Sequence, residues 1–481
     1  MSRIITKSIN TLIFICVFII SFNSLSQNNS SIQQIKQHKN HLNDISPYIK
    51  YSKKTIAFTN ATLIDGTGND IKRNQTIIVE NGLFKALGST NNTAIPKEIL
   101  TINLNGKTVI PGIIGMHNHL HIPGFPYVGD IAAKLYLANG VTTIQTCGAA
   151  SPYKELELAK KIALGKHIGP DIIPSAPFIT GEGGNPNMII PKNENHLKDT
   201  MQHWINQGVK WFKVYRNTHP NDLKIIIDEA HKNNAKVRGH LCSITFEEAA
   251  KLGIDAIEHG LNSMSDFRTG KNYGICNGDR KYIDSLDLNS DKVHQLLQLL
   301  VQKKVFLTST LSIFEASIPN RIHIDNRTLE IMSPYLKSQY KENKKELESK
   351  KQDFTRNKRL KRIMQLEYQY YKMGGLVCAG VDAGRHVLPG FGDQRNYELL
   401  IEAGFSVEQA IQIMTGNGAR ALEINSIGTI ELGKTANFVI LNGDLENNAT
   451  IIKNVETVFK NGIGYNPIKI LNDNKGKFGL E

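Results

Sequence analysis

The rhythm of hydrophobic and polar positions changes twice along the chain. The first part has short apolar runs that alternate with polar residues, at 56–60, 75–80 and 83–88. Asn81-Gly82 lies between two of these runs, and an Asn-Gly pair in that place is a strong hairpin signal. A similar pattern returns near the other end, at 437–442 and 455–462. Two β-rich flanks that are too short to stand alone predict one small β-sandwich built from both ends of the chain.

Between the flanks, apolar strand candidates alternate with helix-like segments such as 222–233, 245–252 and 291–302. The eight candidates are residues 113–117, 141–146, 172–178, 211–215, 237–241, 256–259, 305–310 and 376–381. This alternation over some 300 residues is typical of a (β/α)8 TIM-like barrel, so we predict an α/β fold with an accessory β-sandwich. Doubly wound sheets share the rhythm, and the strand count alone does not separate the two.

The N-terminal residues have the pattern of a targeting signal. Arg3 and Lys7 precede an apolar run at 11–20, and small residues stand before a cleavage site between Ser26 and Gln27. The run is only about half of the roughly 20 residues that a membrane-spanning helix needs. We therefore expect export to the periplasm or the medium, with no stable membrane anchor after cleavage. The expected parts are a signal peptide (1–26), a polar lead-in (27–54), β-sandwich parts (55–110 and 425–467), the barrel (111–424, with a basic helical insertion at 321–372) and a C-terminal tail (468–481).

The charge balance does not require a nucleic-acid partner. The 481 residues include 57 Lys and Arg against 44 Asp and Glu, a net charge of +13, which becomes +11 once Arg3 and Lys7 leave with the signal. The segment 321–372 holds 14 basic residues but also 7 acidic ones. Mixed signs favour a solvated helical insertion over a nucleic-acid surface, so no nucleic acid is expected as a partner.

The cysteines do not have the spacing of a zinc ribbon. Of five cysteines, Cys16 leaves with the signal, and the remaining four contain no CxxC pair. Cys147, Cys242 and Cys378 lie in apolar, strand-like runs, where we expect buried thiols. Export would permit a disulfide, but the sequence assigns no pair among these three and Cys276.

Chemistry-bearing residues stand where strand candidates end. His117 and His119 are two residues apart, on one face of an extended chain, and His240, His259 and Asp382 end three later strands. Barrel enzymes collect their site residues at this end of the strands. Four imidazoles and a carboxylate suit a first-row divalent metal such as zinc. A single strand histidine is more often a core residue, and His119 with His121 is a competing pair, but the order of the whole set favours a metal centre.

Lys213 is the unusual member, because it lies inside the apolar strand Trp-Phe-Lys-Val-Tyr. A buried ammonium among metal ligands would be costly and would repel a cation. Burial favours the neutral amine, which can capture CO₂ and become a carbamate, an anionic ligand able to bridge two metals. The alternative is an edge lysine that points to solvent.

This ordered set resembles the amidohydrolase superfamily, specifically the imidazolonepropionase-like branch that includes secreted Xaa-Pro and Xaa-Arg dipeptidases. The resemblance runs from about residue 55 to 465 and includes Val-Ile-Pro-Gly-Ile-Ile from position 109, Gly-Val-Lys-Trp-Phe-Lys-Val-Tyr from 208 and Gly-Thr-Ile-Glu-Leu-Gly-Lys from 428. It implies a metal-dependent barrel and a composite β-sandwich. It also implies one divalent metal, zinc first and manganese also suited, at His117, His119 and Asp382, a second at His240 and His259, and carboxylated Lys213 between them. Gly115, Val381 and Asn437 depart from the family pattern, but none removes a ligand.

The resemblance and the ligand set together predict an enzyme that hydrolyses an amide bond in dipeptides or N-acyl amino acids. Asp382 would move the proton from the attacking water to the leaving amine. Tyr215 lies two residues after Lys213 and would contact the oxyanion or a substrate carboxylate, unless it only packs at the barrel rim. Arg385 and His386 are further candidate substrate contacts. A lactone, ester or phosphotriester hydrolase would use the same groups, whereas a non-enzymatic binding protein would be expected to lack ligands. The substrate side chain, the metal and the choice between monomer and homo-oligomer are left open.

Overall fold

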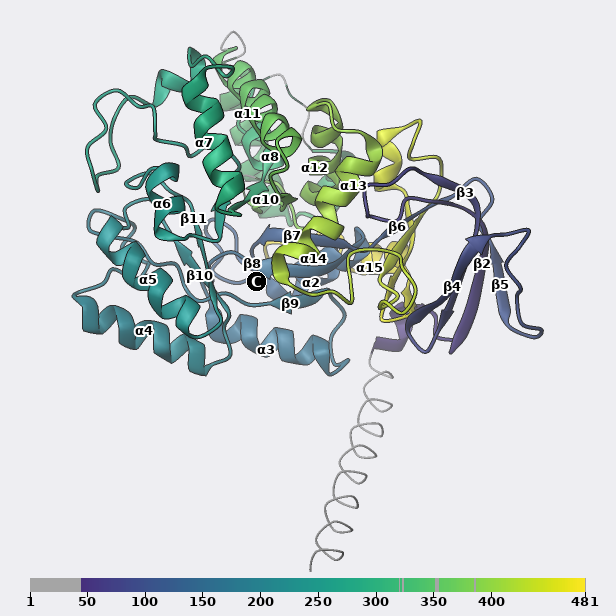
Figure 1. Cartoon of the computed structure of the whole chain (residues 1–481). Helices are drawn as coiled ribbons and strands as arrows, with labels where there is room; N and C mark the ends of the chain where they lie inside the picture. The colour runs from purple at the N-terminus through teal and green to yellow at the C-terminus, as the bar shows by residue number, and fades with distance from the viewer. Residues whose placement is uncertain (1–44, 320, 322–323, 351–353, 385, 481) are drawn as a thin grey trace, which may run out of the picture.

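The structure is a computed structural model that describes residues 45–319, 321, 324–350, 354–384 and 386–480. The predicted signal peptide and most of the predicted lead-in therefore lie outside the described residues. Figure 1 shows a helix-covered body with a β-rich part at one side, in which strands from the start and the end of the chain lie together.

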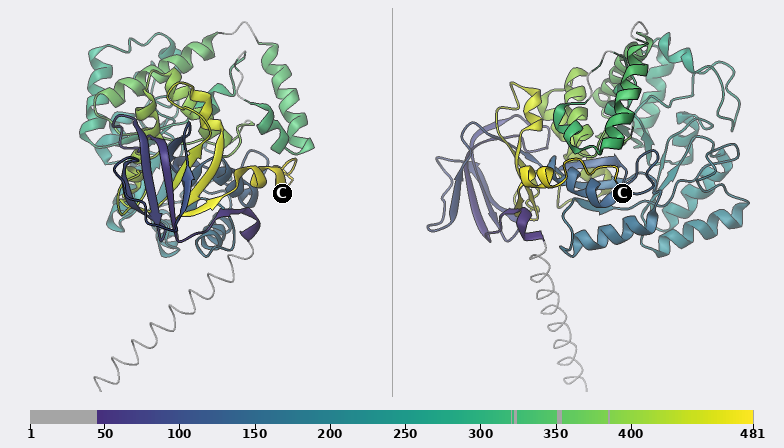
Figure 2. Two further views of the ribbon diagram at one scale, coloured as in Figure 1. Left: turned by 90° about the vertical axis from the view of Figure 1, so that its right-hand side faces the viewer. Right: turned by 180° about the vertical axis from the view of Figure 1, so that it is seen from behind.

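The β-rich part is one nine-stranded sheet that joins the two ends of the chain. Its order is β1-β17-β16-β15-β6-β2-β3-β4, with β5 paired to β2 off this path. The strands are β1 (Ile49–Tyr51), β2 (Thr55–Leu63), β3 (Lys72–Glu80), β4 (Leu83–Ser89), β5 (Leu100–Asn103), β6 (Thr108–Pro111), β15 (Phe438–Leu441), β16 (Val455–Lys460) and β17 (Ile463–Tyr465). The antiparallel pairing of β6 with β15 connects the N-terminal strands to the C-terminal ones. Figure 2 shows these early and late strands side by side.

Aromatic side chains fill the core of this sheet. The ring of Phe58 lies 5.3 Å from that of Phe438 and 5.2 Å from that of Phe459, in edge-to-face contacts. Phe438 and Phe459 stack at 4.4 Å. Because Phe58 comes from the N-terminal flank and the other two from the C-terminal flank, the core can form only when both flanks are present.

The hairpin predicted at Asn81-Gly82 is confirmed. β3 and β4 pair antiparallel on either side of these two residues, whose φ angles are 51° and 81°. Two consecutive positive φ values are the requirement of a type I′ turn, which explains why this Asn-Gly pair marks a hairpin.

The eight strands predicted for the barrel are all present, and they run parallel. The first three, β7 (Ile113–Asn118), β8 (Val141–Thr146) and β9 (Asp171–Ile173), form one sheet. The other five form a second sheet in chain order: β10 (Trp211–Val214), β11 (Lys236–Gly239), β12 (Ala256–Glu258), β13 (Phe306–Ser309) and β14 (Val377–Ala379).

Backbone hydrogen bonds link the two sheets at both junctions. The amide of Ile179, beyond β9, donates to the carbonyl of Lys213 at 2.9 Å, and the amide of Tyr215 donates back to Ile179 at 2.8 Å. At the other junction, the amide of Asp382 donates to the carbonyl of His117 at 2.8 Å. A Cβ atom on Gly380 would lie 2.2 Å from the amide nitrogen of His117, so β14 approaches β7 this closely only with glycine there. The predicted α/β class with a parallel strand series is confirmed.

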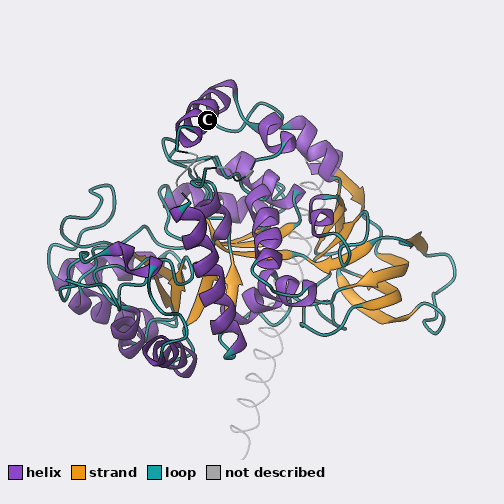
Figure 3. Ribbon diagram, turned by 90° about the horizontal axis from the view of Figure 1, so that it is seen from above, coloured by secondary structure: helices purple, strands orange, loops and turns teal. Residues whose placement is uncertain are grey.

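Helices separate and cover the strands, as Figure 3 shows. Helix α7 (Asp291–Gln302) illustrates why, because Val293, Leu296, Leu297 and Leu300 recur at helical spacing and are all buried. None of the helices in the described ranges is long and apolar enough to cross a membrane. The others are α2 (Gly129–Ala138), α3 (Pro152–Ala163), α4 (Glu194–Asn206), α5 (Pro220–Lys232), α6 (Phe246–Leu252), α8 (Leu311–Glu315), α9 (Asn326–Ile331), α10 (Pro334–Glu348), α11 (Thr355–Lys372), α12 (Phe391–Glu402), α13 (Val407–Met414), α14 (Gly416–Leu422) and α15 (Pro467–Asp473), with 3-10 turns η1 (Ser46–Tyr48), η2 (Arg280–Asp284) and η3 (Ala449–Lys453).

Three segments differ from the sequence-based expectation. The end of the expected lead-in forms the edge strand β1, which is only three residues long and therefore too short to show alternation. The expected tail contains α15 and buries Ile470 and Phe478, so it packs on the body. Within the expected solvated insertion, α10 is largely exposed, but α11 buries one apolar face that includes Leu360 and Ile363.

Candidate active site

The predicted site residues meet at the carboxyl ends of the barrel strands. His117 is the last residue but one of β7, His240 and His259 directly follow β11 and β12, and Asp382 follows β14. They line one cavity of about 840 Å³, together with His119, His121, Lys213 and Tyr215. Parallel strands place their carboxyl ends at one edge of the barrel, so residues that are 265 positions apart in the sequence converge here.

Three of these side chains form a compact set of potential metal ligands. Nε2 of His119 lies 3.1 Å and Nε2 of His117 lies 3.5 Å from Oδ1 of Asp382. The ligand atoms of the set lie within 4.8 Å of one another. His259 approaches the other carboxylate oxygen of Asp382 at 3.5 Å, and the ring of His240 lies 4.4 Å from that of His259. Two imidazoles and a carboxylate at this spacing fit a first-row divalent cation, with two more imidazoles adjacent.

His121, the competing histidine, lines the cavity beside this set. Its ring lies 4.6 Å from that of His119, but the compact set of ligand atoms consists of His117, His119 and Asp382. Burial, with the nearby charge of His119, lowers the pKa of His121 to about 3. The geometry therefore favours the pair His117 and His119 over the pair His119 and His121.

Two of the converging residues have unusual backbone conformations. The φ angle of His259 is 67° and that of Asp382 is 47°, both in the left-handed region that non-glycine residues rarely adopt. Side chains normally alternate along a strand, but the turn at His259 lets Glu258 and His259 both contact groups of the site. Residues held in such conformations cluster at functional sites.

Lys213 is buried within β10, at 1% exposure. Among the described residues, its Nζ has no hydrogen-bond partner. A buried polar group without a partner is costly, and modification of the amine to an anion would give Lys213 oxygen atoms that cations can bind. The edge-lysine alternative is wrong, because the side chain points away from solvent.

Glu258 and Arg238 lie behind the predicted ligands and do not line the cavity, and the sequence analysis identified neither as a site residue. Nδ1 of His117 and Nε of Arg238 both lie in short contact with the Glu258 carboxylate, and Arg238 also donates to Oγ1 of Thr308 at 3.0 Å. Burial would raise the pKa of Glu258, but Arg238, Lys213 and His117 hold it well below its ordinary value. An ionised carboxylate only accepts hydrogen bonds, so Nδ1 of His117 is the donor and Nε2 is the ring nitrogen that remains for a metal. Burial would lower the pKa of His117, but the neighbouring acidic groups hold it well above its ordinary value, so a cation that binds Nε2 displaces a proton.

Electrostatics leave Asp382, His240 and His259 in the form that binds cations. Burial would raise the pKa of Asp382, but His117, His119 and His259 lower it well below its ordinary value. Burial lowers the pKa of His240 and of His259 well below the ordinary value, and neighbouring cationic groups lower both further. A carboxylate and neutral imidazoles are the protonation states that metal ligation requires.

Aromatic side chains form much of the cavity wall. The ring of Tyr215 lies 4.9 Å from that of His240 and 5.8 Å from that of Phe178, so the expected contact residue does face the site. Phe314 packs edge-on against His259 at 5.9 Å. Of the two weaker candidates, Arg385 lies outside the described residues, and the ring of His386 lies 5.5 Å from that of Tyr340.

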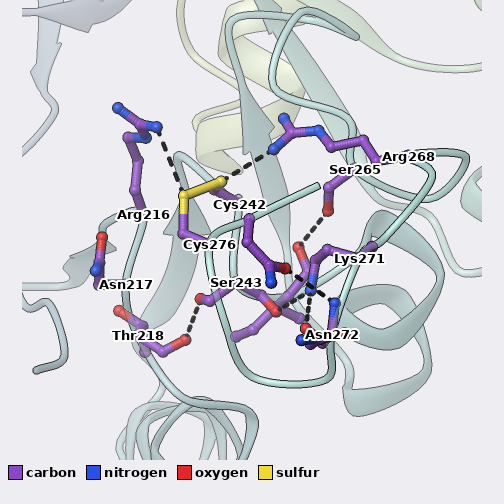
Figure 4. Close-up of a disulfide and its surroundings, with 12 residues drawn as sticks. Arg216, Asn217, Thr218, Cys242, Ser243, Ser265, Arg268, Lys271, Asn272 and Cys276 are labelled. Atoms are coloured by element: carbon purple, nitrogen blue, oxygen red, sulfur yellow. Dashed lines mark hydrogen bonds between the residues drawn. A yellow bond between two sulfur atoms is a disulfide. The ribbon is translucent and has the colours of Figure 1, made fainter. Parts of the chain in front are cut away.

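A disulfide connects the site to the loop after β12. Cys242, two residues beyond His240, is bonded to Cys276, and Figure 4 shows Arg216 and Arg268 reaching the two sulfur atoms from opposite sides. The expectation of a buried free thiol is therefore wrong for Cys242. The partner lies in a polar loop 34 residues away, and sequence spacing gave no signal for that pairing. Cys147 and Cys378 are buried free thiols, as expected.

Comparison with known proteins agrees with this picture. Residues 379–464 match a model of the amidohydrolase family. A dihydroorotase from Trichlorobacter lovleyi is 41% identical over 70 residues, which are 14% of this chain and 16% of that protein. The chain thus aligns with about one sixth of the length of this curated relative, and the sequence match bears only on that part.

Solved structures extend the likeness to most of the chain. A candidate prolidase from Bifidobacterium longum has a TM-score of 0.65 at 22% identity and covers 88% of this chain and 99% of its own. An Xaa-Pro dipeptidase with methionine bound in its active site has a TM-score of 0.64 at 18% identity, over 86% of this chain and 100% of its own. At these identities the likeness shows the fold. The predicted resemblance to amidohydrolases is confirmed, by sequence in the C-terminal segment and by fold over the described chain.

Proposed function

We propose that this chain, whose fold is that of the amidohydrolases, is a metal-dependent hydrolase that cleaves the amide bond of dipeptides or N-acyl amino acids. The observation that carries the proposal is the convergence of His117, His119 and Asp382, with His240 and His259 adjacent, at the floor of one cavity. The structural likeness to an Xaa-Pro dipeptidase supports the choice of amide substrates.

The position of each residue indicates the step of the reaction to which it contributes. Divalent cations, when bound, would make a coordinated water acidic enough to ionise near neutral pH and would polarise the scissile carbonyl. Asp382 stays ionised and can accept the proton of the attacking water and return it to the leaving amine. Tyr215 faces the same cavity and donates a hydrogen bond to the substrate oxygen that becomes negative. Phe178 and Phe314 exclude water from the reacting bond.

Lys213 is the proposed bridge between two cations. Its amine attacks the carbon of CO₂, forms an N–C bond and releases one proton, and the product is an anionic carbamate with two oxygen ligands. The buried and unpartnered Nζ supports this assignment, because the modification replaces a potential buried cation by an anion that cations can neutralise.

The protein is proposed to act outside the cytoplasm. The disulfide between Cys242 and Cys276 supports export, since such bonds persist mainly in oxidising compartments. The signal peptide proposed for residues 1–26 is consistent with this location. Peptide sequencing of the protein recovered from the producing cell tests it, and an N-terminus at Gln27 is expected.

The proposed activity is tested with protein that begins at Gln27 and is supplied with zinc or manganese and bicarbonate. A panel of dipeptides and N-acyl amino acids is screened for amine release, with Asp382→Asn as the matched inactive variant and Asp70→Asn, a surface change on the β-rich part, as the control. Release that Asp382→Asn abolishes and Asp70→Asn retains supports the proposal. If no compound of the panel releases amine although the protein is shown to hold two metals per chain, the amide assignment is overturned. Lactones, esters and phosphotriesters are then the next substrates to test.

A further inference from the structure

A second cavity lies beside the catalytic one and is lined by arginines. It has a volume of about 460 Å³, and Arg280, Arg356 and Arg359 form its polar wall. Phe314 lines both cavities and packs against His259, so the two cavities share one wall residue. The arginines come from η2 and from α11, two elements that the chain brings together only in the folded state.

The positive charge of this cavity is only partly balanced by acidic groups. Asp284 forms a two-pronged ion pair with Arg359, at 3.0 and 2.6 Å, and Arg356 donates to the carbonyl of Ser317 at 2.7 Å. Among the described residues, Arg280 forms no salt bridge with a carboxylate. Three guanidinium groups therefore line the cavity, and among the described residues only that of Arg359 forms a salt bridge with a carboxylate, so an anionic ligand can neutralise the excess.

Two further arginines extend this charge toward the catalytic cavity. Arg216 follows Tyr215 and donates to the sulfur of Cys276 at 3.5 Å, while Arg268 donates to the sulfur of Cys242 at 3.1 Å. Figure 4 shows both guanidinium groups directed at the disulfide. Neither is paired with a carboxylate in the described part of the chain. Burial lowers the pKa of Arg280, and the positive charges of Arg216 and Arg268 lower it further, so both arginines are cationic neighbours of Arg280.

We infer that this arginine-lined cavity binds an acidic side chain of the substrate, so that the enzyme prefers amides of glutamate- or aspartate-like residues. The inference rests on the proposed hydrolase function and names its substrate class. Ile318, Leu360 and Ile363 give the cavity an apolar surface next to the arginines. A carboxylate on a short chain of methylene groups matches both surfaces, whereas inorganic phosphate matches only the arginines.

The disulfide fixes the position of the acidic-side-chain cavity relative to the reacting bond. Cys276 precedes Arg280 by four residues, and its bond to Cys242 ties this loop to the strand end that carries His240. The loop has few other covalent or strand constraints between β12 and η2. Reduction of the disulfide is therefore expected to reduce the preference for acidic substrates.

The kinetic test compares substrates that differ only in charge, N-acetylglutamate against N-acetylglutamine and Ala-Glu against Ala-Gln. For the wild-type enzyme, kcat/KM is expected to favour the acidic member by about tenfold or more, mainly through KM, because charge-assisted hydrogen bonds contribute on this scale. Arg280→Gln should bring the ratio of the two kcat/KM values close to one, and reduction of the disulfide between Cys242 and Cys276 should lower this ratio. Arg73→Gln, a surface arginine on β3, should leave the ratio unchanged. A wild-type preference for the neutral member, or a ratio that Arg280→Gln does not change, overturns the inference.

A binding measurement separates this inference from the proposed activity. Calorimetric titration of the metal-free protein with glutarate is expected to show binding that Arg280→Gln weakens about tenfold and Arg73→Gln does not. Binding with this dependence but no turnover on any amide keeps the cavity and rejects the hydrolase proposal. Turnover without Arg280-dependent selectivity or binding rejects the cavity and keeps the hydrolase. Inorganic phosphate that binds as tightly as glutarate, with the same dependence, overturns the assignment to a carboxylate side chain.

Discussion

Glu258 accepts a hydrogen bond from Nδ1 of His117 and so directs the opposite ring nitrogen, Nε2, toward Asp382. The contact ties the first strand of the barrel to the sixth. Because the carboxylate is also bound by Arg238, it has little freedom to rotate away from the imidazole. The orientation of one potential metal ligand therefore depends on a residue that does not itself face the substrate.

We expect Glu258→Gln to lower metal affinity by about 10- to 100-fold, the range typical when the hydrogen-bond partner of a ligating histidine is lost. The amide keeps the shape of the side chain but loses the charge that fixes the donor role of His117. Competition with a chromophoric chelator measures the affinity, and circular dichroism checks the fold. Glu157→Gln, on the exposed face of α3, is the control. Unchanged metal affinity in a folded Glu258→Gln protein would show that the contact has no part in orienting the ligand.

Lys213→Ala should abolish activity and bring the metal content from two ions toward one, because the proposed bridging oxygen atoms are removed. Acetate or propionate added at millimolar concentration should restore part of the activity, since a free carboxylate fits the space and supplies two oxygen ligands. Activity assays and elemental analysis of the metal content follow both effects. Lys210→Ala, an exposed lysine just before β10, is the control. A Lys213→Ala enzyme with full activity and two metals would rule out the bridge.

The stability of the metal-free protein should depend on pH through Glu155. Burial raises the pKa of this residue to about 8, above the value of 4.5 that an unhindered glutamate has. The native state therefore retains a proton that the unfolded state has lost, and Glu155 alone should lower the free energy of unfolding by at most about 1.4 kcal/mol per pH unit as pH rises from 4.5 to 8.

Glu155→Gln should remove the part of this slope that Glu155 contributes and make the protein more stable than wild type above pH 8. Glu367 and Asp393, whose pKa values burial raises to about 7, should keep the rest of the slope. Urea unfolding at a series of pH values measures both effects. The matched control is Glu157→Gln on the same helix, whose carboxylate is exposed and pairs with Lys161. A slope that persists unchanged in Glu155→Gln would assign it to other groups.

Replacement of Cys242 and Cys276 by serine should lower the free energy of unfolding by about 4 kcal/mol. The estimate follows from the entropy of closing a loop of 34 residues in the unfolded chain. Denaturant unfolding under oxidising conditions measures it. The wild-type protein unfolded in the presence of a reductant should match the double variant, and a large difference between the two would show that the serines disturb the packing independently of the bond.

The sequence predicted those parts of the fold that have a local signal. Each barrel strand is a short apolar run, and His117, His240 and Asp382 stand at strand ends, where parallel topology brings them together. Glu258 could not be assigned in the same way, because a carboxylate next to His259 should point to the opposite face of a regular strand. Only the left-handed backbone at His259 brings both side chains to the site, and that conformation has no signature in the sequence.

Pairings between residues that are far apart in the chain could not be predicted from the sequence either. The bond from Cys242 to Cys276 joins an apolar strand end to a polar loop, and neither neighbourhood identifies the other. The strand β1 has three residues, and its place at the sheet edge depends on β17, more than 400 positions away. Such features depend on tertiary contacts rather than on local propensity.

The sheet that joins the two ends of the chain has a consequence for the order of synthesis. Strand β6 needs β15 as its antiparallel neighbour, and β1 needs β17, so these partners become available only when the last part of the chain has been made. Until then, the N-terminal strands have open edges that can pair with other chains. Pairing across such long separations is slow. A chain truncated before β15 would therefore lose more than its C-terminal segment, because the strands β1 and β6 would lack the C-terminal partners with which they pair.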